Sequence, residues 1–291
     1  MGAMADDARP ALDGPTVREL LQRPAGPLSR VEVVPRAGST NADVVRDLRA
    51  DPDSWPDLSL LVADHQDAGK GRRDRTWSTP PGTSVTCTFV VRPDVPAASL
   101  GWIPLLAGLG VVTAVRATAG VRAVLKWPND VLVPASDEVE GWGAFRKVGG
   151  ILTEVVPDAA GRPSAVVVGI GLNVLQTADE LPVPSAGSLA LAGARHVDRL
   201  GLLVALVTSL EEIAGRWRSS GGSAATSGLD AEVAGVVATI GNRVRASLPG
   251  DVVVDGVAHG LDDDGALVVV DDDGLVQRVL AGDVHHVRTT A

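Results

Sequence analysis

Two strand-like segments joined by a glycine-rich basic loop restrict the fold more than any other feature of the sequence. LSLLVADHQ (58–66) is largely apolar, and SVTCTFVV (84–91) alternates apolar and polar residues, as a half-buried strand does. The loop between them, GKGRRDRTWSTPPG (69–82), carries four cations within six positions: Lys70, Arg72, Arg73 and Arg75. Glycines allow close approach of a ligand and guanidinium groups pair with phosphate or carboxylate, so the loop suits an anion. An ordinary solvated loop is the alternative.

The charge balance of the chain narrows the kind of anion. The 291 residues include 36 acidic and 26 basic side chains, which gives a net charge of −10. A general nucleic-acid binder needs a broad cationic face, so a small anion is favoured. The sequence has no uninterrupted apolar run of about 18 residues and no secretory signal pattern, and its single Cys87 forms no internal disulfide. We therefore expect a cytoplasmic protein that binds neither nucleic acid nor membranes.

The spacing of strands and helices predicts an α/β (α+β) domain over residues 30–235. Further strands are expected at VEVV, AVLKWP, KVGGILTEVV and SAVVVGIGLNVL, and helices at 39–50, 99–120 and 198–217. A short Pro-, Ala- and Asp-rich extension (1–29), expected to be partly disordered, precedes this domain, and within it only TVRELLQ (16–22) looks helical. The core is expected to begin at Arg30. The first four residues of the extension, MGAM, are interpreted as a remnant of cloning.

Residues 236–291 have a different character. They contain short valine-rich runs separated by turns, which predicts a small all-β barrel. The turn sequence DDDG occurs at 262–265 and at 271–274. It lacks the alternating spacing of a calcium loop, so both copies are interpreted as solvated turns.

Three motifs place polar residues at strand ends. KWPND (126–130) offers a carboxylate that could hold magnesium bound to nucleotide phosphates, or it is a plain Asn-Asp turn. KVGGILTE (147–154) offers a lysine as a point charge for phosphate or carboxylate, or as a structural strand entry. GIGLN (169–173) allows close approach of a ligand but is not a GxGxxG fingerprint.

The order of these motifs carries more information than any one of them. GSTN (38–41), the basic loop, KWPND, KVGGILTE, GIGLN and then a small β domain resemble the biotin protein ligases across about residues 30–288. The resemblance implies a class-II synthetase-like catalytic domain, with a mixed or antiparallel sheet and flanking helices, and a C-terminal SH3-like barrel. It implies a monofunctional ligase without an N-terminal DNA-binding domain.

The same resemblance implies a reaction and its participants. Biotin and MgATP would give biotinyl-5′-AMP, and a lysine of a biotin carboxyl carrier domain would then receive the biotin. ATP and Mg²⁺ are expected as the substrate complex, with no tightly bound metal. The chain is expected to be a monomer or a weak homodimer.

Roles for individual residues also follow from the resemblance. Arg72 and Lys147 would be catalytic, and Asp130 would bind the metal. The biotin-binding residues would be Ser39, Thr40, Asn41, Gln66, Lys70, Gly71, Arg72, Lys147 and Gly150. The nucleotide-binding residues would be Arg73, Arg75, Trp77, Lys126, Asn129, Asp130 and Asn173.

Some features depart from the family pattern. The loop is usually GRGRRGR, whereas this chain has Lys70 and Asp74. Lys70 keeps the charge without the planar fork, and Asp74 is expected to pair with a neighbouring arginine. Residues 134–146, interpreted as an elaborated hairpin tip, make the connection before Lys147 longer than usual. The alternatives are a lipoate–protein ligase, a biotin-sensing DNA-binding repressor and a catalytically silent binding scaffold.

Overall fold

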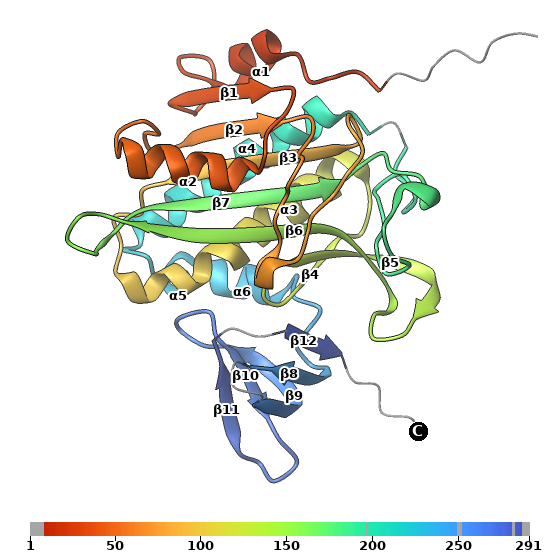
Figure 1. Ribbon diagram of the computed structural model, residues 1–291. Helices are drawn as coiled ribbons and strands as arrows, with labels where there is room; N and C mark the ends of the chain where they lie inside the picture. The colour runs from red at the N-terminus through yellow and green to blue at the C-terminus, as the bar shows by residue number, and fades with distance from the viewer. Residues whose placement is uncertain (1–8, 196, 249–251, 281–282, 287–291) are drawn as a thin grey trace, which may run out of the picture.

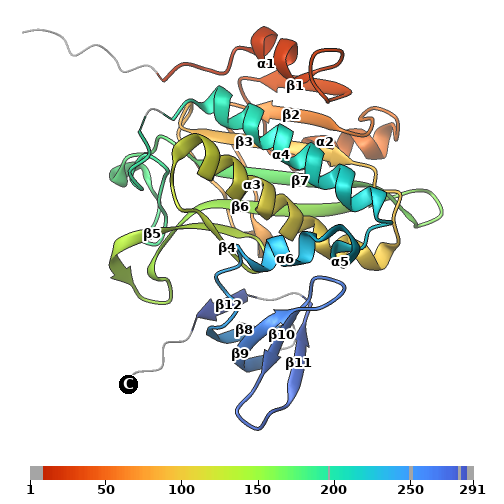
Figure 2. The same cartoon turned by 180° about the vertical axis from the view of Figure 1, so that it is seen from behind.

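The protein consists of a seven-stranded sheet flanked by helices and a smaller five-stranded sheet beside it (Figure 1). The computed structural model describes residues 9–195, 197–248, 252–280 and 283–286, so the MGAM segment lies outside the described residues. One face of the large sheet is covered by α2, and the other by α3 and α4 (Figure 2). The predicted mixed α/β architecture is confirmed.

The large sheet has the strand order β1-β2-β3-β7-β6-β5-β4. Only the β1–β2 pair is parallel, and the other neighbouring strands are antiparallel. Its strands are β1 (Arg30–Val34), β2 (Ser59–Ala63), β3 (Ser84–Val91), β4 (Val124–Lys126), β5 (Asp130–Val139), β6 (Gly143–Pro157) and β7 (Pro163–Asn173). The helices are α1 (Gly14–Leu21), α2 (Thr40–Ala50), α3 (Ile103–Ala119), α4 (Arg199–Ser219), α5 (Ala224–Ser227) and α6 (Leu229–Ala234), with 3₁₀ turns η1 (Arg72–Asp74), η2 (Ala97–Trp102) and η3 (Ala178–Glu180).

The central strand β3 is buried on both faces, not on one as its alternation predicted. Val85, Cys87 and Phe89 join the core under α3 and α4. Val90 packs in the cluster with α2, and Thr88 lies on that same side. Thr88 is fully buried there because its hydroxyl donates to Thr40 Oγ1 and to Asn41 Oδ1, both at 2.8 Å. Hydrogen bonds therefore allow the polar face of β3 to be buried.

The apolar helix α3, which lies within the helix expected at 99–120, contributes most of its residues to the main core. Gly108 and Gly110 lie where a Cβ would meet the side chains of Leu125 and Leu210, so these glycines permit close packing. The segment Ala97–Ala119 is long and apolar enough to cross a membrane by length and composition alone, but 67% of its most apolar window is buried. Burial of this extent is typical of a helix in a protein core.

The expectation that the core begins at Arg30 is wrong. Val17, Leu21 and Leu28 are at most 2% exposed and join the main core. Asp13 begins α1 by accepting a hydrogen bond from the Thr16 backbone N–H. The helix itself agrees with the expected helical stretch at 16–22, but its burial was not expected. Val17 and Leu21 lie on one face and are buried.

The smaller sheet has the order β11-β10-β9-β8-β12 and is antiparallel throughout. Its strands are β8 (Arg243–Ser247), β9 (Val253–Leu261), β10 (Leu267–Val270), β11 (Val276–Val279) and β12 (Asp283–His286). The first DDDG turn is not simply solvated as expected. The indole N–H of Trp102 donates to the backbone oxygen of Asp263 (2.6 Å), and that of Trp127 donates to the backbone oxygen of Gly265 (3.1 Å). This turn therefore links the C-terminal domain to the domain that contains the large sheet.

Candidate active site

The motifs singled out from the sequence surround one cavity between the basic loop and the sheet strands β3, β7 and β6. The register explains their convergence, because Gly150 lies opposite both Asp130 and Gly171 in the neighbouring strands. All the site residues expected from the resemblance line the cavity except Arg73 and Lys126. Their chemical roles remain predictions.

One end of the cavity is the N-terminus of α2. Ser39 is the N-cap residue but makes no capping hydrogen bond, and Gln66 takes that role. Its Oε1 accepts from the Thr40 backbone N–H at 2.8 Å and from the Thr40 hydroxyl at 3.1 Å. These hydrogen bonds join α2 to the segment that follows β2. The Ser39 hydroxyl has no hydrogen bond to any described side chain.

Asn41 is held by three hydrogen bonds. Its Nδ2 donates to the Leu152 backbone oxygen (3.0 Å) and to Glu154 Oε1 (3.1 Å), while its Oδ1 accepts from Thr88. A Cβ at Gly169 would collide with this amide, which explains one glycine of GIGLN. Asn41 therefore fixes α2 to the sheet at the cavity wall.

The polar end of the cavity contains the charged residues of three motifs. Arg72 Nη1 donates to Asn129 Oδ1 at 3.0 Å, which brings the basic loop against KWPND. Asn129 in turn donates to the Ile151 backbone oxygen at 2.9 Å, so its amide is oriented by β6. Lys147 Nζ lies 2.6 Å from Asp130 Oδ1, in a pair whose side chains are 27% and 18% exposed. Two cations and a carboxylate thus converge at one place.

Trp77 forms an apolar wall beside these charges. Its ring packs directly on Gly171, and the ammonium of Lys147 lies 5.7 Å from the ring centroid. The indole N–H is buried and has no hydrogen-bond partner among the residues that the structure describes. Because a buried donor without a partner is unfavourable, this group is available to a ligand that brings an acceptor.

Asn173 closes the far side together with a segment that the sequence did not suggest. Its Nδ2 donates to the Gly187 backbone oxygen at 2.9 Å, and its Oδ1 accepts from Gln176 at 3.1 Å. Pro182, Val183 and Ala186 complete the wall. They had no recognisable signal, because their position depends on backbone hydrogen bonds between Lys147 and residues 185 and 187.

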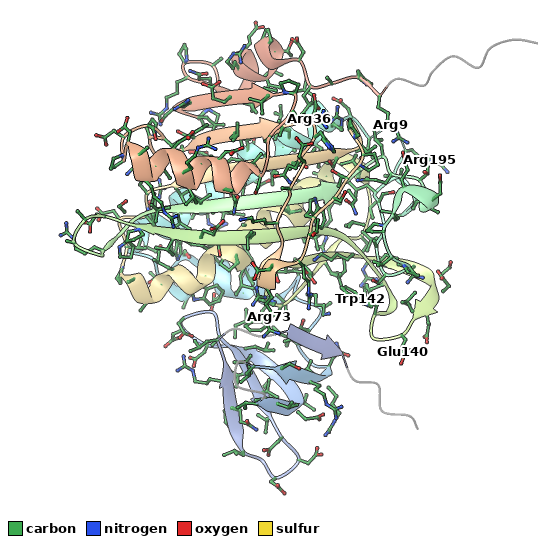
Figure 3. All side chains as sticks on the ribbon, viewed as in Figure 1. Arg9, Arg36, Arg73, Glu140, Trp142 and Arg195 are labelled. Carbon is green, nitrogen blue, oxygen red and sulfur yellow. The ribbon has the colours of Figure 1, made fainter. Side chains whose placement is uncertain are left out.

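Arg73 and Lys126 lie outside the cavity lining. Arg73 Nη2 donates to the Ser247 backbone oxygen of β8 at 3.0 Å, and Figure 3 shows Arg73 at the junction with the C-terminal domain. Lys126 is 6% exposed, and its ammonium lies 4.2 Å from the ring centroid of Trp142. Trp142 belongs to the 134–146 segment, which forms the predicted hairpin tip between β5 and β6.

Asp74 differs from the expectation that it pairs with an arginine. Its carboxylate has no ion pair or hydrogen bond within the described part of the chain. Asp74 and Arg73 adopt left-handed backbone conformations, with φ of 57° and 53°. Aspartate tolerates this region better than most residues, so Asp74 takes the backbone geometry that glycine takes most readily.

The described residues also bear on metal ligation and on thiolate catalysis. No cluster of three or more His, Cys, Asp or Glu side chains that could hold a metal occurs within them. Burial raises the pKa of the Cys87 thiol to about 12, which opposes thiolate catalysis. The cavity is best suited to bind and neutralise anions beside an aromatic surface.

Comparisons with known proteins agree with this geometry. The biotin/lipoate A/B protein ligase family model matches residues 33–173, and the biotin protein ligase C terminal domain model matches residues 239–287. The biotin--[acetyl-CoA-carboxylase] ligase of Mycobacterium tuberculosis is 37% identical over 97% of this chain and 98% of that protein. The bifunctional ligase/repressor BirA of Bacillus subtilis is 30% identical over 79% of this chain and 66% of its own length.

A solved structure supports the fold. The biotin protein ligase from Aquifex aeolicus in complex with biotin and ATP has a TM-score of 0.70 and 23% identity, over 90% of this chain and 100% of that one. At this identity the likeness concerns the fold alone. Both family models and the M. tuberculosis relative, in contrast, span the catalytic and C-terminal parts of the sequence. The chain therefore belongs to the biotin protein ligase family.

Proposed function

We propose that this protein is a biotin–[acetyl-CoA-carboxylase] ligase, an ATP-dependent and AMP-forming enzyme. It activates biotin as biotinyl-5′-AMP and transfers the biotin to a lysine of a carboxylase carrier domain. The observation that carries the proposal is the convergence of Arg72, Lys147 and Asp130 at the polar end of a cavity that has an indole wall. Membership of the family supports biotin as the acid substrate and a carrier-domain lysine as the acceptor.

The chemistry explains why cations are needed. A carboxylate oxygen of biotin attacks the α-phosphorus of ATP, and the bond to pyrophosphate breaks. Because both reactants are anions, positioned cations must offset their repulsion and stabilise the charge that develops. Arg72 and Lys147 are placed to do so. The lysine amine of the carrier then attacks the carbonyl carbon of the mixed anhydride, and AMP leaves.

The ion pair between Lys147 and Asp130 suggests how the substrates engage these residues. Without substrate, each side chain is the charge partner of the other. Magnesium that arrives with ATP needs few protein ligands beyond one or two carboxylates and the phosphates. Asp130 would contribute such a carboxylate, and Lys147 would then be free to pair with the biotin carboxylate and the adenylate phosphate.

The remaining site residues are assigned by their place in the cavity. Ser39, Thr40, Gln66 and Gly150 would surround the biotin, and Trp77 would cover the adenine. We also propose that the enzyme acts in the cytoplasm, without nucleic acid or membrane, as a monomer or weak homodimer. The net charge of −10 and the buried free thiol of Cys87 support the first two of these points.

One experiment tests the activity directly. The protein is incubated with ATP, magnesium, biotin and a purified carrier domain, and the mass of the carrier is then measured by mass spectrometry. A mass gain of one biotinyl group is expected, together with biotin-dependent pyrophosphate exchange. Because the matching family model also covers lipoate ligases, lipoate is offered in a parallel reaction. Exchange with lipoate and not with biotin would overturn the proposal.

A further inference from the structure

A second hollow opens beside the cavity, between the β5–β6 hairpin and residues 178–193. We call it the hairpin groove. Apolar and proline side chains from both segments line it, among them Val133, Pro134, Val139, Leu181, Pro184 and Leu191. Pro182, Val183 and Ala186 line both the groove and the cavity. The groove therefore continues directly into the proposed active site.

The groove walls are preformed. The 178–193 segment is fixed to β6 because the Lys147 N–H donates to the Ser185 oxygen and the Gly187 N–H donates to the Lys147 oxygen, both at 2.8 Å. At its other end, Glu180 accepts two hydrogen bonds from the Arg9 guanidinium, at 2.8 and 3.0 Å. A rigid surface loses little entropy when a partner binds.

The groove nevertheless presents apolar side chains to solvent. Val183 is 51% exposed and Leu191 is 53% exposed, although most large apolar residues of this domain are buried. Exposed apolar side chains gathered in a hollow are typical of an interaction site. Their position beside the cavity distinguishes them from the exposed apolar residues of the C-terminal domain.

The hairpin side of the groove is acidic. Asp137 lines the groove, where it pairs with Arg146 at 2.5 Å. Glu138 and Glu140 are exposed farther along the same hairpin, which gives it an excess of acidic side chains, and Figure 3 shows Glu140 at its outer end. The acceptor of the proposed reaction is a lysine, which is cationic until it loses a proton. An apolar floor with an acidic rim therefore complements a folded domain that presents a lysine.

We infer that the hairpin groove docks the carboxyl carrier domain during biotin transfer, so that the acceptor lysine enters the cavity past Val183. The inference rests on the proposed function and adds the surface that selects the protein acceptor. It assigns a purpose to the 134–146 segment, which forms one wall of the groove. Docking affects only the second half of the reaction, because adenylate formation needs no protein acceptor.

The test separates docking from chemistry with the variant Leu191→Asp. Leu191 lines the groove but not the cavity. We expect kcat/KM for a purified carrier domain to fall about tenfold, since truncating or charging a central apolar contact commonly costs that much. Biotin-dependent pyrophosphate exchange should stay within about twofold of wild type, and so should capture of the adenylate by hydroxylamine, an amine that needs no docking.

Val155→Asp is the matched control. Val155 is 48% exposed on β6 and lies outside both the cavity and the groove, so its kcat/KM for the carrier should not change. An unchanged kcat/KM in Leu191→Asp would overturn the inference. So would an equal loss with carrier and with hydroxylamine, or a shift in sedimentation that reveals a second copy of the chain in the groove. A wild-type protein that forms no adenylate would instead overturn the proposed function.

Discussion

The contact between Trp77 and Gly171 leads to a prediction about Gly171→Ala. An ideal Cβ at residue 171 would lie 2.6 Å from Cε2, 2.7 Å from Nε1 and 3.0 Å from Cζ2 of the Trp77 indole. Non-bonded carbon atoms pack at about 3.5–4.0 Å, so the indole would have to withdraw by roughly 1 Å. Since all three atoms belong to one rigid bicyclic ring, no rotation of a terminal group relieves the clash.

The size of the effect follows from the proposed role of Trp77. Stacking of a base on an aromatic side chain contributes about 1–3 kcal/mol. Loss of that stacking corresponds to a rise of roughly 5- to 150-fold in the KM for ATP. Pyrophosphate exchange at varied ATP concentration measures this value, and the KM for biotin should change less.

Gly150→Ala is a close control, because Gly150 lies opposite Gly171 in the sheet register. Its added Cβ would meet Lys147 Nζ at 3.3 Å and Trp77 Cζ3 at 3.6 Å, and the lysine end is flexible. An ATP KM in Gly171→Ala no higher than in Gly150→Ala would refute the reasoning. The combination of Gly171→Ala with Trp77→Ala should be no worse than Trp77→Ala alone; full additivity would show that the indole does not mediate the effect.

Three further predictions concern charge and burial. Lys147→Ala should slow adenylation by on the order of 10²–10³, and Lys147→Arg should restore it only partly; a wild-type rate of pyrophosphate exchange would remove Lys147 from the site. Hydrogen bonds from Arg9, the largest cause, and from Thr177 lower the pKa of Glu180 from 4.5 to about 2, so their stabilisation is present above pH 4.5 and is lost as the pH falls towards 2. Arg9→Ala should therefore lower the free energy of unfolding in urea at pH 7, and the gap to wild type should narrow between pH 4.5 and 2; a constant gap would contradict this. Because burial raises the pKa of Cys87 to about 12, thiol reagents should label it at pH 8 only after denaturation, and rapid labelling of the native protein would contradict the burial.

The cavity could be anticipated from the sequence because its polar residues belong to short motifs at strand ends. Asp130 and Lys147, for example, came together because β5 and β6 pair as neighbours. The partners of Arg73 and Lys126 could not be anticipated in the same way. Ser247 lies 174 residues after Arg73 and offers only a backbone oxygen, which leaves no trace in residue type. Trp142 reaches Lys126 because a hairpin tip folds back, and the conformation of a long hairpin tip is weakly encoded locally.

The tryptophan contacts with the first DDDG turn affect how the molecule unfolds. Trp127 belongs to KWPND, and its indole donates to Gly265 across the domain junction, as Trp102 does to Asp263. Removal of the C-terminal domain would break both hydrogen bonds, each with a net contribution of about 0.5–1.5 kcal/mol, and would expose the two indoles to water. The two domains should therefore melt in a single calorimetric transition. A nucleotide bound beside KWPND would raise the melting temperature of the distant β domain along with that of its own.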